Sequence, residues 1–370
     1  MKKILFLIHD LGHGGAEKVL VNLVNNLDRT KFDISVLALF GGGVNEKYLA
    51  PDIHYITAFR RSFPANSKIM KLFAPKTLHK LFVKDHYDIE VSYLEGPSAR
   101  VISGCPDPSV KLVSWIHSEQ HTKKVLASSF RSFGEAKRCY ERFDRTICVS
   151  RDLKDAFCSV LDFKKPCDVL YNTNESDAIV RESAQSVDDG IFHDNEIKIV
   201  GVGKIFKNKG FDRMARITKK LRDEGYPVHF YALGEGLMRA EIESYIKDNS
   251  ISDSFTFLGY QTNPYKYVAK CDLFVCASLR EGFSTAATEA LIVGTPICTT
   301  DVSGMHEMLG ENNEWGVITE NNEDALYIGI KDLLDHPEKL KSYKNKAAER
   351  GKIFSTEATT RAVEDMLLNL

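Results

Sequence analysis

The feature that most constrains the fold of this chain is an alternation of short apolar runs with amphipathic helical segments, which occurs twice. In the first half, the apolar runs predict strands at 4–8, 33–39, 89–93, 111–115 and 145–149, with helices such as 15–27 between them. The pattern restarts with predicted strands at 197–202, 228–233, 254–258, 273–277 and 296–299. Strands that alternate with helices form parallel sheets covered on both faces. We therefore predict an α/β protein with two doubly wound domains.

The helices of the second half are predicted at 211–224, 237–247, 285–293 and 324–334, and a last amphipathic helix at 356–370. Residues 175–194 are polar and lack strong periodicity, which is typical of a linker. We therefore expect an N-terminal domain over 1–180 and a C-terminal domain over 195–350. The segment 351–370 is expected to be a C-terminal helix that packs back on the N-terminal domain.

Composition agrees with a globular chain of two domains. The 370 residues are 43% hydrophobic and 27% charged, and no apolar run approaches the ~18 residues that a membrane span requires. The apolar start of the chain stops at His9 and Asp10, which favours a buried first strand over a signal peptide. The eight cysteines form no C-x-x-C pair and several lie in apolar runs, so we expect reduced, buried thiols in a cytosolic protein.

Charge is distributed unevenly along the chain. Residues 1–186 contain 27 Lys and Arg against 22 Asp and Glu, whereas the remainder contains 22 against 29. The basic excess has a local source, because the segment 53–84 contains no acid. Its basic residues alternate with Phe, Leu and Met, and they are Arg60, Arg61, Lys68, Lys71, Lys76, Lys80 and Lys84. The segment is either a solvated surface, a nucleic-acid contact for which no known motif is present, or a surface that binds anionic lipid.

Two glycine-containing loops follow predicted strands and open predicted helices. The first, at 11–17, contains Gly12, Gly14 and Gly15, but Glu17 occupies the place of the third glycine of a dinucleotide fingerprint. It is either a phosphate-binding turn at a helix N-terminus or a simple tight turn. The second, at 201–211, carries three lysines and suits either a bound diphosphate or a solvated basic turn.

A third loop, at 278–290, carries the most specific signal. Glu281 follows a predicted strand, Ser284 or Thr285 can cap the next helix, and Glu289 lies in the first turns of that helix. Two carboxylates at this spacing can bind the hydroxyls of a sugar and a ribose, while main-chain N–H groups of 283–285 face phosphates. The alternative is a surface helix with two incidental acids.

At these residues the sequence resembles the retaining glycosyltransferases of family 4. The Glu-x7-Glu motif of that family matches Glu281 and Glu289, and Gly294-Thr295-Pro296 follows as in the family. Further matches are Gly14-Gly15-Ala16-Glu17, Gly203-Lys204, Lys209-Gly210-Phe211-Asp212 and Gly234-Glu235-Gly236. The resemblance spans nearly the whole chain and implies the GT-B fold, in which two Rossmann-like domains face each other across a cleft.

The resemblance also implies roles for individual residues. Glu281 with the main chain of Gly282 and Phe283 would hold the hydroxyls of the donor sugar, and His117 would lie beside that sugar. Glu281 and His117 are thus the catalytic-site candidates, although His117 also suits a satisfied buried histidine. The implied donor-binding set is Gly15, Gly203, Lys204, Lys209, Gly234, Gly282, Phe283, Ser284, Thr285 and Glu289.

Within that set Lys209 and Lys204 would bind the diphosphate, Glu289 the ribose, and Gly15 the β-phosphate. The family has arginine where Lys204 stands, so the planar two-point contact with phosphate is lost there.

The resemblance implies retaining transfer of a hexose or N-acetylhexosamine from a nucleotide-diphosphate sugar, with UDP as the expected nucleotide. No Asp-x-Asp sequence is present, and the pairs His9/His13 and His117/His121 have no third ligand beside them in the sequence. We therefore expect no metal and no cofactor, with lysines and helix N-termini stabilising the leaving diphosphate.

The expected acceptor is a glycan, carried on polyprenyl diphosphate or another lipid, in the synthesis of a bacterial capsule or lipopolysaccharide. Such an acceptor favours the membrane interpretation of 53–84 and a peripheral location at the cytoplasmic face of the cell membrane, with no nucleic-acid partner. Two alternatives stay open: a sugar-nucleotide epimerase of the same fold, and a catalytically silent partner that binds a nucleotide sugar.

Overall fold

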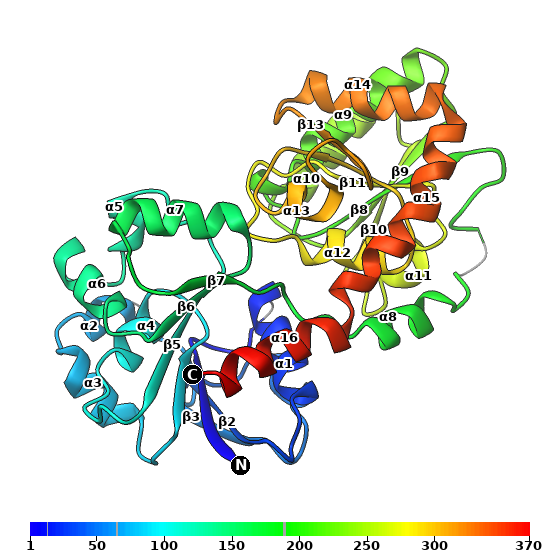
Figure 1. The fold of residues 1–370 in the computed structure, drawn as a ribbon. Coiled ribbons are helices and arrows are strands. Elements are labelled where there is room, and N and C mark those ends of the chain that lie inside the picture. Colours follow the sequence, from blue (N-terminus) through cyan, green and yellow to red (C-terminus); the bar gives the residue numbers. More distant parts are fainter. Residues whose placement is uncertain (13, 64–65, 188–189) are drawn as a thin grey trace. The chain divides into compact units, whose positions relative to one another are not determined.

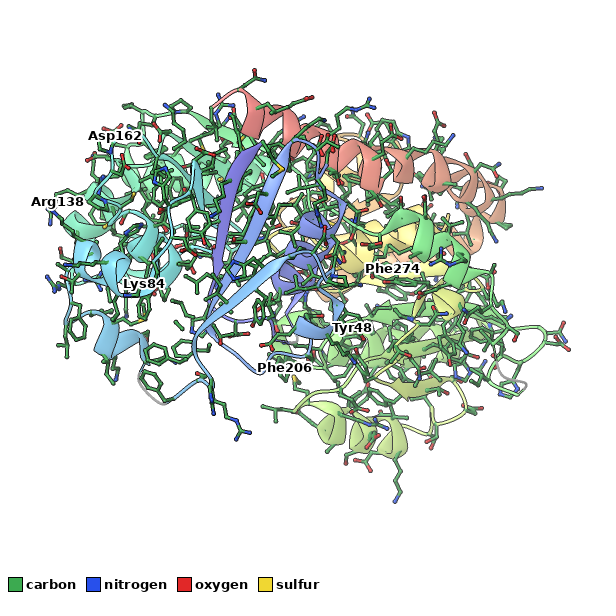
Figure 2. All side chains as sticks on the ribbon, turned by 90° about the horizontal axis from the view of Figure 1, so that it is seen from below. Tyr48, Lys84, Arg138, Asp162, Phe206 and Phe274 are labelled. Atoms are coloured by element: carbon green, nitrogen blue, oxygen red, sulfur yellow. The ribbon has the colours of Figure 1, made fainter. Side chains whose placement is uncertain are left out.

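The computed structural model describes residues 1–12, 14–63, 66–187 and 190–370, which form two compact units (Figure 1). Unit 1 comprises Met1–Asn174 and Thr356–Leu370, and unit 2 comprises Glu175–Ser355. Side chains fill the interior of both units, as with Phe274 in unit 2, whereas Arg138 projects from the edge of unit 1 (Figure 2).

Unit 1 is built on a parallel sheet whose strand order is β3-β2-β1-β4-β5-β6-β7. Its strands are β1 Lys2–Ile8, β2 Phe32–Phe40, β3 His54–Phe59, β4 Ile89–Ser92, β5 Lys111–Ile116, β6 Arg145–Cys148 and β7 Cys167–Val169. Its helices are α1 Gly15–Asn26, α2 Asn66–Met70, α3 Pro75–Phe82, α4 Pro97–Ile102, α5 Lys123–Leu126, α6 Phe133–Tyr140, α7 Arg151–Leu161 and α16 Thr356–Leu368, with a 3₁₀ turn at Glu46–Tyr48.

Helix α16 belongs to unit 1 although it follows unit 2 in the sequence. It lies beside α1 (Figure 1). The carboxylate of Glu364 accepts a hydrogen bond from the main-chain N–H of Asp28 at 2.8 Å and pairs with Lys31 Nζ at 2.6 Å. The end of the chain is therefore fixed to the loop between α1 and β2.

Unit 2 repeats this architecture with the parallel order β10-β9-β8-β11-β12-β13. Its strands are β8 Ile197–Val202, β9 Val228–Leu233, β10 Phe255–Gly259, β11 Leu273–Cys276, β12 Ile297–Thr300 and β13 Val317–Thr319. Its helices are α8 Ser176–Ser183, α9 Phe211–Asp223, α10 Arg239–Asp248, α11 Tyr265–Val268, α12 Thr285–Ile292, α13 Met305–Leu309, α14 Glu323–Asp335 and α15 Pro337–Gly351, with 3₁₀ turns at Lys207–Lys209 and Lys352–Phe354.

Periodicity explains how these elements pack. Met214, Ile217 and Leu221 recur on one face of α9 and are each at most 1% exposed, within a core that includes Phe230 of β9. The two doubly wound sheets predicted from the sequence are confirmed.

Several predictions of local structure were wrong. Residues 176–183, expected to lie in an irregular linker, form α8, which packs against α11 and α12. The basic segment 53–84 begins with β3, a strand that was not predicted. Strands β7 and β13 were also not predicted. No helix among the described residues combines the length and apolar character needed to cross a bilayer.

The eight cysteines are free thiols and six of them are buried. The thiols of Cys148 and Cys167 contact each other, at 3.8 Å between the sulfur atoms. This agrees with the prediction of reduced, mostly buried cysteines.

Candidate functional site

In unit 2 the predicted donor-binding loops lie at the point where the strand order reverses. Strands β8 and β11 are neighbours, and the chain continues from them toward opposite edges of the sheet. Ligands of doubly wound sheets bind beyond the carboxyl ends of the strands at such a switch point. The loop after β8 carries Gly203, Lys204 and Lys209, and the loop after β11 carries Glu281 and its neighbours. Topology thus brings together two motifs that are about 70 residues apart.

An ion pair joins these two loops. Lys209 Nζ lies 2.6 Å from Glu281 Oε1, and the hydroxyl of Ser278 donates to the same oxygen at 2.6 Å. The Glu281 side chain is 10% exposed and that of Lys209 is 27% exposed. The main-chain N–H of Leu279 also donates to the carbonyl of Asn208 at 2.8 Å. Lysine and carboxylate are therefore held side by side at the carboxyl edge, each with a partly exposed charge.

Helix α12 supplies the second acid of the motif. The Ser284 hydroxyl accepts a hydrogen bond from the N–H of Ala287, so Ser284 is the N-cap that the sequence predicted, with Thr285 as the first helical residue. Glu289 lies one turn further along, 9% exposed, and accepts a hydrogen bond from the Tyr265 hydroxyl at 3.2 Å. This hydrogen bond holds the carboxylate of Glu289 against α11, which carries Tyr265.

The neighbouring residues have different surroundings. Lys204 is exposed on the loop after β8, whereas Phe283 is buried and its ring packs against Phe354 with centroids 5.8 Å apart. Gly282 is partly exposed, so its exposure is intermediate between those of Lys204 and Phe283. The side chain of Phe283 therefore anchors the loop against the 3₁₀ turn at Lys352–Phe354.

A close approach of two loops explains the glycine at 234. Its φ is +138°, and a Cβ atom there would lie 1.9 Å from the carbonyl oxygen of Gly203. Only glycine allows the loops after β8 and β9 to touch in this way. Gly234 thus shapes the edge of the site rather than contributing a functional group.

Unit 1 has a second switch point, between β1 and β4. Gly15 is the first residue of α1 and follows the loop after β1, as the sequence predicted. Asp10 forms this loop by accepting a hydrogen bond from the N–H of Gly12 at 2.8 Å. A hydrogen bond from His9, together with that of Gly12, lowers the pKa of Asp10 despite its partial burial. The conformation of this loop is therefore held by a side-chain hydrogen bond, and the loop carries the negative charge of Asp10.

His117 follows β5 and packs against Tyr93, with ring centroids 4.8 Å apart. Burial lowers the pKa of His117 to about 3, so the imidazole is neutral at physiological pH. Its Nε2 atom is buried and has no hydrogen-bond partner among the described residues. A satisfied buried histidine, the alternative raised above, does not describe this side chain.

Sequence reasoning missed Glu95, which lies on the loop after β4. Its carboxylate accepts the main-chain N–H of His117 at 2.9 Å and the hydroxyl of Ser118. The available signal was an acid followed by a glycine, here Gly96, in the loop after an apolar strand, a feature that Glu281 and Gly282 share.

The basic segment of unit 1 has both buried and exposed parts. Met70, Leu78 and Phe82 belong to the core, so these three apolar side chains of the segment do not face a lipid interface. The basic side chains are exposed except that of Lys71, which is partly buried; the predicted set is Arg60, Arg61, Lys68, Lys71, Lys76 and Lys80.

Of the histidine pairs considered for metal binding, His13 lies outside the described residues. Among those described, His79, Glu90 and Cys105 form a buried group whose ligand atoms lie within 4.8 Å of one another. His79 Nε2 and a Glu90 oxygen are 2.8 Å apart, and the Cys105 thiol faces the other oxygen at 3.8 Å. Hydrogen bonds within the group account for its burial, and the group lies beneath α3 rather than at the carboxyl edge.

Comparison with known proteins agrees with this geometry. Residues 13–173 match the family described as Glycosyltransferase Family 4, and residues 184–350 match Glycosyl transferases group 1. The chain is 29% identical, over the whole of both sequences, to an N-acetylgalactosamine-N,N'-diacetylbacillosaminyl-diphospho-undecaprenol 4-alpha-N-acetylgalactosaminyltransferase of Campylobacter jejuni.

A second relative is the lipopolysaccharide core biosynthesis glycosyltransferase LpsD of Rhizobium meliloti, 22% identical over 98% of this chain and 96% of that protein. The fold is similar to that of Anabaena Alr3699/HepE in complex with UDP and glucose, with a TM-score of 0.76, 17% identity and full coverage of both chains. Two Rossmann-like units, two family matches and a Glu-x7-Glu motif at a switch point place this chain among the family 4 glycosyltransferases of GT-B fold.

Proposed function

We propose that this glycosyltransferase moves a hexose or N-acetylhexosamine from a UDP-sugar to a lipid-linked glycan, with retention of configuration and without a metal. The observation that carries the proposal is the contact between Lys209 and Glu281 at the switch point of unit 2, with Glu289 on the adjoining helix. A cation for the diphosphate next to acids for hydroxyls suits a nucleotide sugar better than any other common ligand.

Each residue has a role that its position supports. Lys209, with the exposed Lys204, neutralises the diphosphate, and the N–H groups at the start of α12 add a positive dipole. Glu281 accepts hydrogen bonds from sugar hydroxyls and Glu289 from the ribose. Because these charges are preorganised, they stabilise the diphosphate as it leaves.

The reaction is a substitution at the anomeric carbon. The bond from that carbon to the phosphate oxygen breaks, and a bond to the acceptor oxygen forms on the same face of the sugar. The proton of the acceptor hydroxyl passes to the departing phosphate oxygen. This scheme requires no nucleophile from the protein, and the neutral imidazole of His117 fits a contact to the sugar rather than a proton carrier.

The polyprenyl-linked acceptor is proposed from the name of the Campylobacter relative, which acts on an undecaprenyl-diphosphate-linked sugar. A surface of unit 1 supports docking at an anionic membrane from the cytoplasmic side. Ile69, Leu72 and Phe73 are 43%, 75% and 43% exposed. They lie among the exposed lysines of α2 and α3, a combination typical of interfacial binding.

Two arginines fix the main chain of the turn that carries these apolar side chains. Arg100 donates to the carbonyl oxygens of Met70 and Phe73, both at 2.6 Å. Arg131 donates to those of Lys71 and Leu72 at 2.6 and 2.8 Å. Four consecutive carbonyl groups, at 70–73, are thus bound by arginine, so the turn presents its apolar side chains without further ordering on binding.

A tracer assay tests the transferase proposal. Full-length protein is incubated with labelled UDP-N-acetylgalactosamine, UDP-N-acetylglucosamine, UDP-galactose or UDP-glucose and a polyprenyl-diphosphate-linked N-acetylhexosamine, with and without EDTA. We expect transfer that persists in EDTA and a product with the anomeric configuration of the donor. Loss of transfer in EDTA would refute metal independence, and epimerised donor in the absence of acceptor would favour the epimerase alternative.

The affinity for UDP tests whether Glu289 binds the ribose, as opposed to an effect that any loss of an acid from unit 2 would have. Glu289→Ala should weaken UDP binding about tenfold or more in calorimetry, since a hydrogen bond to a charged group contributes roughly 1.5–3 kcal/mol. The control is Glu241→Ala, an exposed acid on α10 of the same unit. Equal UDP affinity in both variants would contradict the ribose assignment.

Sedimentation with vesicles tests the membrane surface. We expect binding to phosphatidylglycerol vesicles that falls in Leu72→Asp and in Lys76→Glu/Lys80→Glu. The matched control reverses Lys341 and Lys344, which are exposed on α15 of unit 2. Equal binding by all variants would discard this surface.

A further inference from the structure

Glu95 occupies the position in unit 1 that corresponds to the donor loops in unit 2. The sheet order reverses between β1 and β4, and Glu95 lies on the loop directly after β4. The loop in which Asp10 accepts a hydrogen bond from Gly12 follows β1, the other strand of this switch point. Since ligands of doubly wound sheets bind at the switch point, Glu95 lies where a ligand of unit 1 is expected.

The carboxylate of Glu95 is held in a fixed orientation. One oxygen accepts the main-chain N–H of His117 at 2.9 Å, and the other accepts the hydroxyl of Ser118. The amide of Gln120 in turn donates to the Ser118 hydroxyl oxygen at 3.1 Å. Hydrogen bonds from the loop after β5 therefore fix an acid on the loop after β4, and a carboxylate that accepts two bonds retains capacity for more.

The electrostatics of Glu95 differ from those of the other acids inside unit 1. Glu135 pairs with Arg100 at 3.1 Å, and Glu90 faces His79 at 2.8 Å. Over the described part of the chain, no lysine, arginine or histidine side chain lies within ion-pair distance of the Glu95 carboxylate.

Burial raises the pKa of Glu95, although its hydrogen bonds from Ser118 and His117 oppose this. The neutral imidazole of His117 cannot compensate the charge. An acid that is partly buried without a counter-charge costs stability, and such groups concentrate at functional sites.

The chemistry of this position selects the ligand. A carboxylate repels phosphate, so the donor diphosphate and the acceptor diphosphate are both unfavourable neighbours. A neutral hydroxyl donates a strong, charge-assisted hydrogen bond to it, and sugars present several such groups. Glu95 retains partial exposure, so a ligand can reach it.

We propose that Glu95 binds a hydroxyl of the terminal sugar of the acceptor glycan and thereby selects the acceptor. This inference rests on the proposed transferase function, because it assigns the acceptor to unit 1. Glu95 contributes recognition, while the proton of the reacting hydroxyl still passes to the leaving phosphate.

Steady-state kinetics of Glu95→Gln test the proposal, using the donor that the unaltered protein transfers and the polyprenyl-diphosphate-linked N-acetylhexosamine acceptor. The amide can keep the bonds to His117 and Ser118 but loses the charge. We expect the acceptor KM to rise about tenfold, as for the loss of one charge-assisted hydrogen bond, and the donor KM to change less than twofold. The control Glu141→Gln alters an exposed acid at the end of α6. An unchanged acceptor KM, or a parallel rise in donor KM, overturns the proposal.

A binding measurement keeps this test independent of turnover. Trp115 on β5 packs against Tyr93, with ring centroids 5.0 Å apart, and Tyr93 packs against His117. Acceptor binding at Glu95 should therefore change the fluorescence of Trp115 in the absence of donor. We expect the dissociation constant from this signal to rise about tenfold in Glu95→Gln; an unchanged constant contradicts the proposal even if no donor is transferred. Absence of transfer by the unaltered protein would count against the proposed function alone.

Discussion

Replacing Lys209 by methionine removes the cation from a partly buried ion pair and leaves its acid in place. Glu281 is 10% exposed, and the oxygen that Lys209 now contacts at 2.6 Å would keep the neutral Ser278 hydroxyl and the weak contact of the Cys276 thiol at 4.0 Å. Breaking a fully buried pair in this way costs about 3–5 kcal/mol. Because Lys209 is 27% exposed, water can replace part of the lost interaction, and we expect about 2 kcal/mol.

The reverse change should cost less. In Glu281→Gln the lysine is left without its acid, but its flexible side chain can turn toward water, and we expect a loss below about 1 kcal/mol. In the double variant neither charge of this pair remains, so Lys209→Met with Glu281→Gln should be more stable than Lys209→Met alone. This asymmetry follows from burial and not from the pair distance, which is the same for both partners.

Thermal unfolding of the full chain without ligand measures these differences. For a unit of this size about 2 kcal/mol corresponds to a fall in Tm of roughly 4–8 °C. Lys204→Met is the matched control, because Lys204 is exposed on the same loop, and it should shift Tm by little. Equal losses in the two single variants, or a double variant whose loss is their sum, would refute the argument that Lys209 compensates a buried charge.

Three further predictions concern stability. Gly210→Ala should lower Tm strongly, by an amount equivalent to about 3 kcal/mol or more, because Gly210 has φ +69° and a Cβ there would lie 2.0 Å from the Ala277 carbonyl oxygen. Burial opposes protonation of His79, but hydrogen bonds to its neighbouring thiol and to Glu90 raise its pKa to about 9. This stabilisation is full below the unfolded pKa of about 6.5 and is lost as pH rises through 9, so Tm should fall between pH 7 and 9.5, and less so in Glu90→Gln. Glu364→Gln should free α16 and increase protease cleavage near residue 355, as gel analysis of timed digests would show.

The sequence predicted the interior strands better than the edges of the sheets. Central parallel strands are buried on both faces and appear as continuous apolar runs, as at Lys2–Ile8 and Val228–Leu233. The strands that were missed, β3, β7 and β13, lie at sheet edges and are only partly buried. An edge strand pairs with one neighbouring strand and is exposed to solvent on its other side, so it contains both polar and apolar residues. Such a strand has no continuous apolar run by which it could be predicted.

The candidate site shows the same limit at the level of contacts. Glu281, Glu289 and Lys209 could be predicted because Glu281 and Lys209 each precede a glycine in a loop after a predicted strand, and Glu289 completes a Glu-x7-Glu motif with Glu281. Glu95 has a similar setting, but its importance depends on Ser118, 23 residues away, and on the absence of a nearby cation among the residues that the structure describes. These conditions arise only when β4 and β5 pair, and the sequence pattern does not express them.

The return of α16 to unit 1 has a consequence for biosynthesis. Unit 2 is inserted between the two parts of unit 1, since Thr356–Leu370 completes the unit that Met1 began. A ribosome must therefore translate all of unit 2 before unit 1 can acquire its last helix, and unit 2 can fold while its predecessor is still unfinished. A shortened or frame-shifted C-terminus would accordingly damage the N-terminal unit, whose contacts at Asp28 and Lys31 lie 336 and 333 residues along the chain from Glu364.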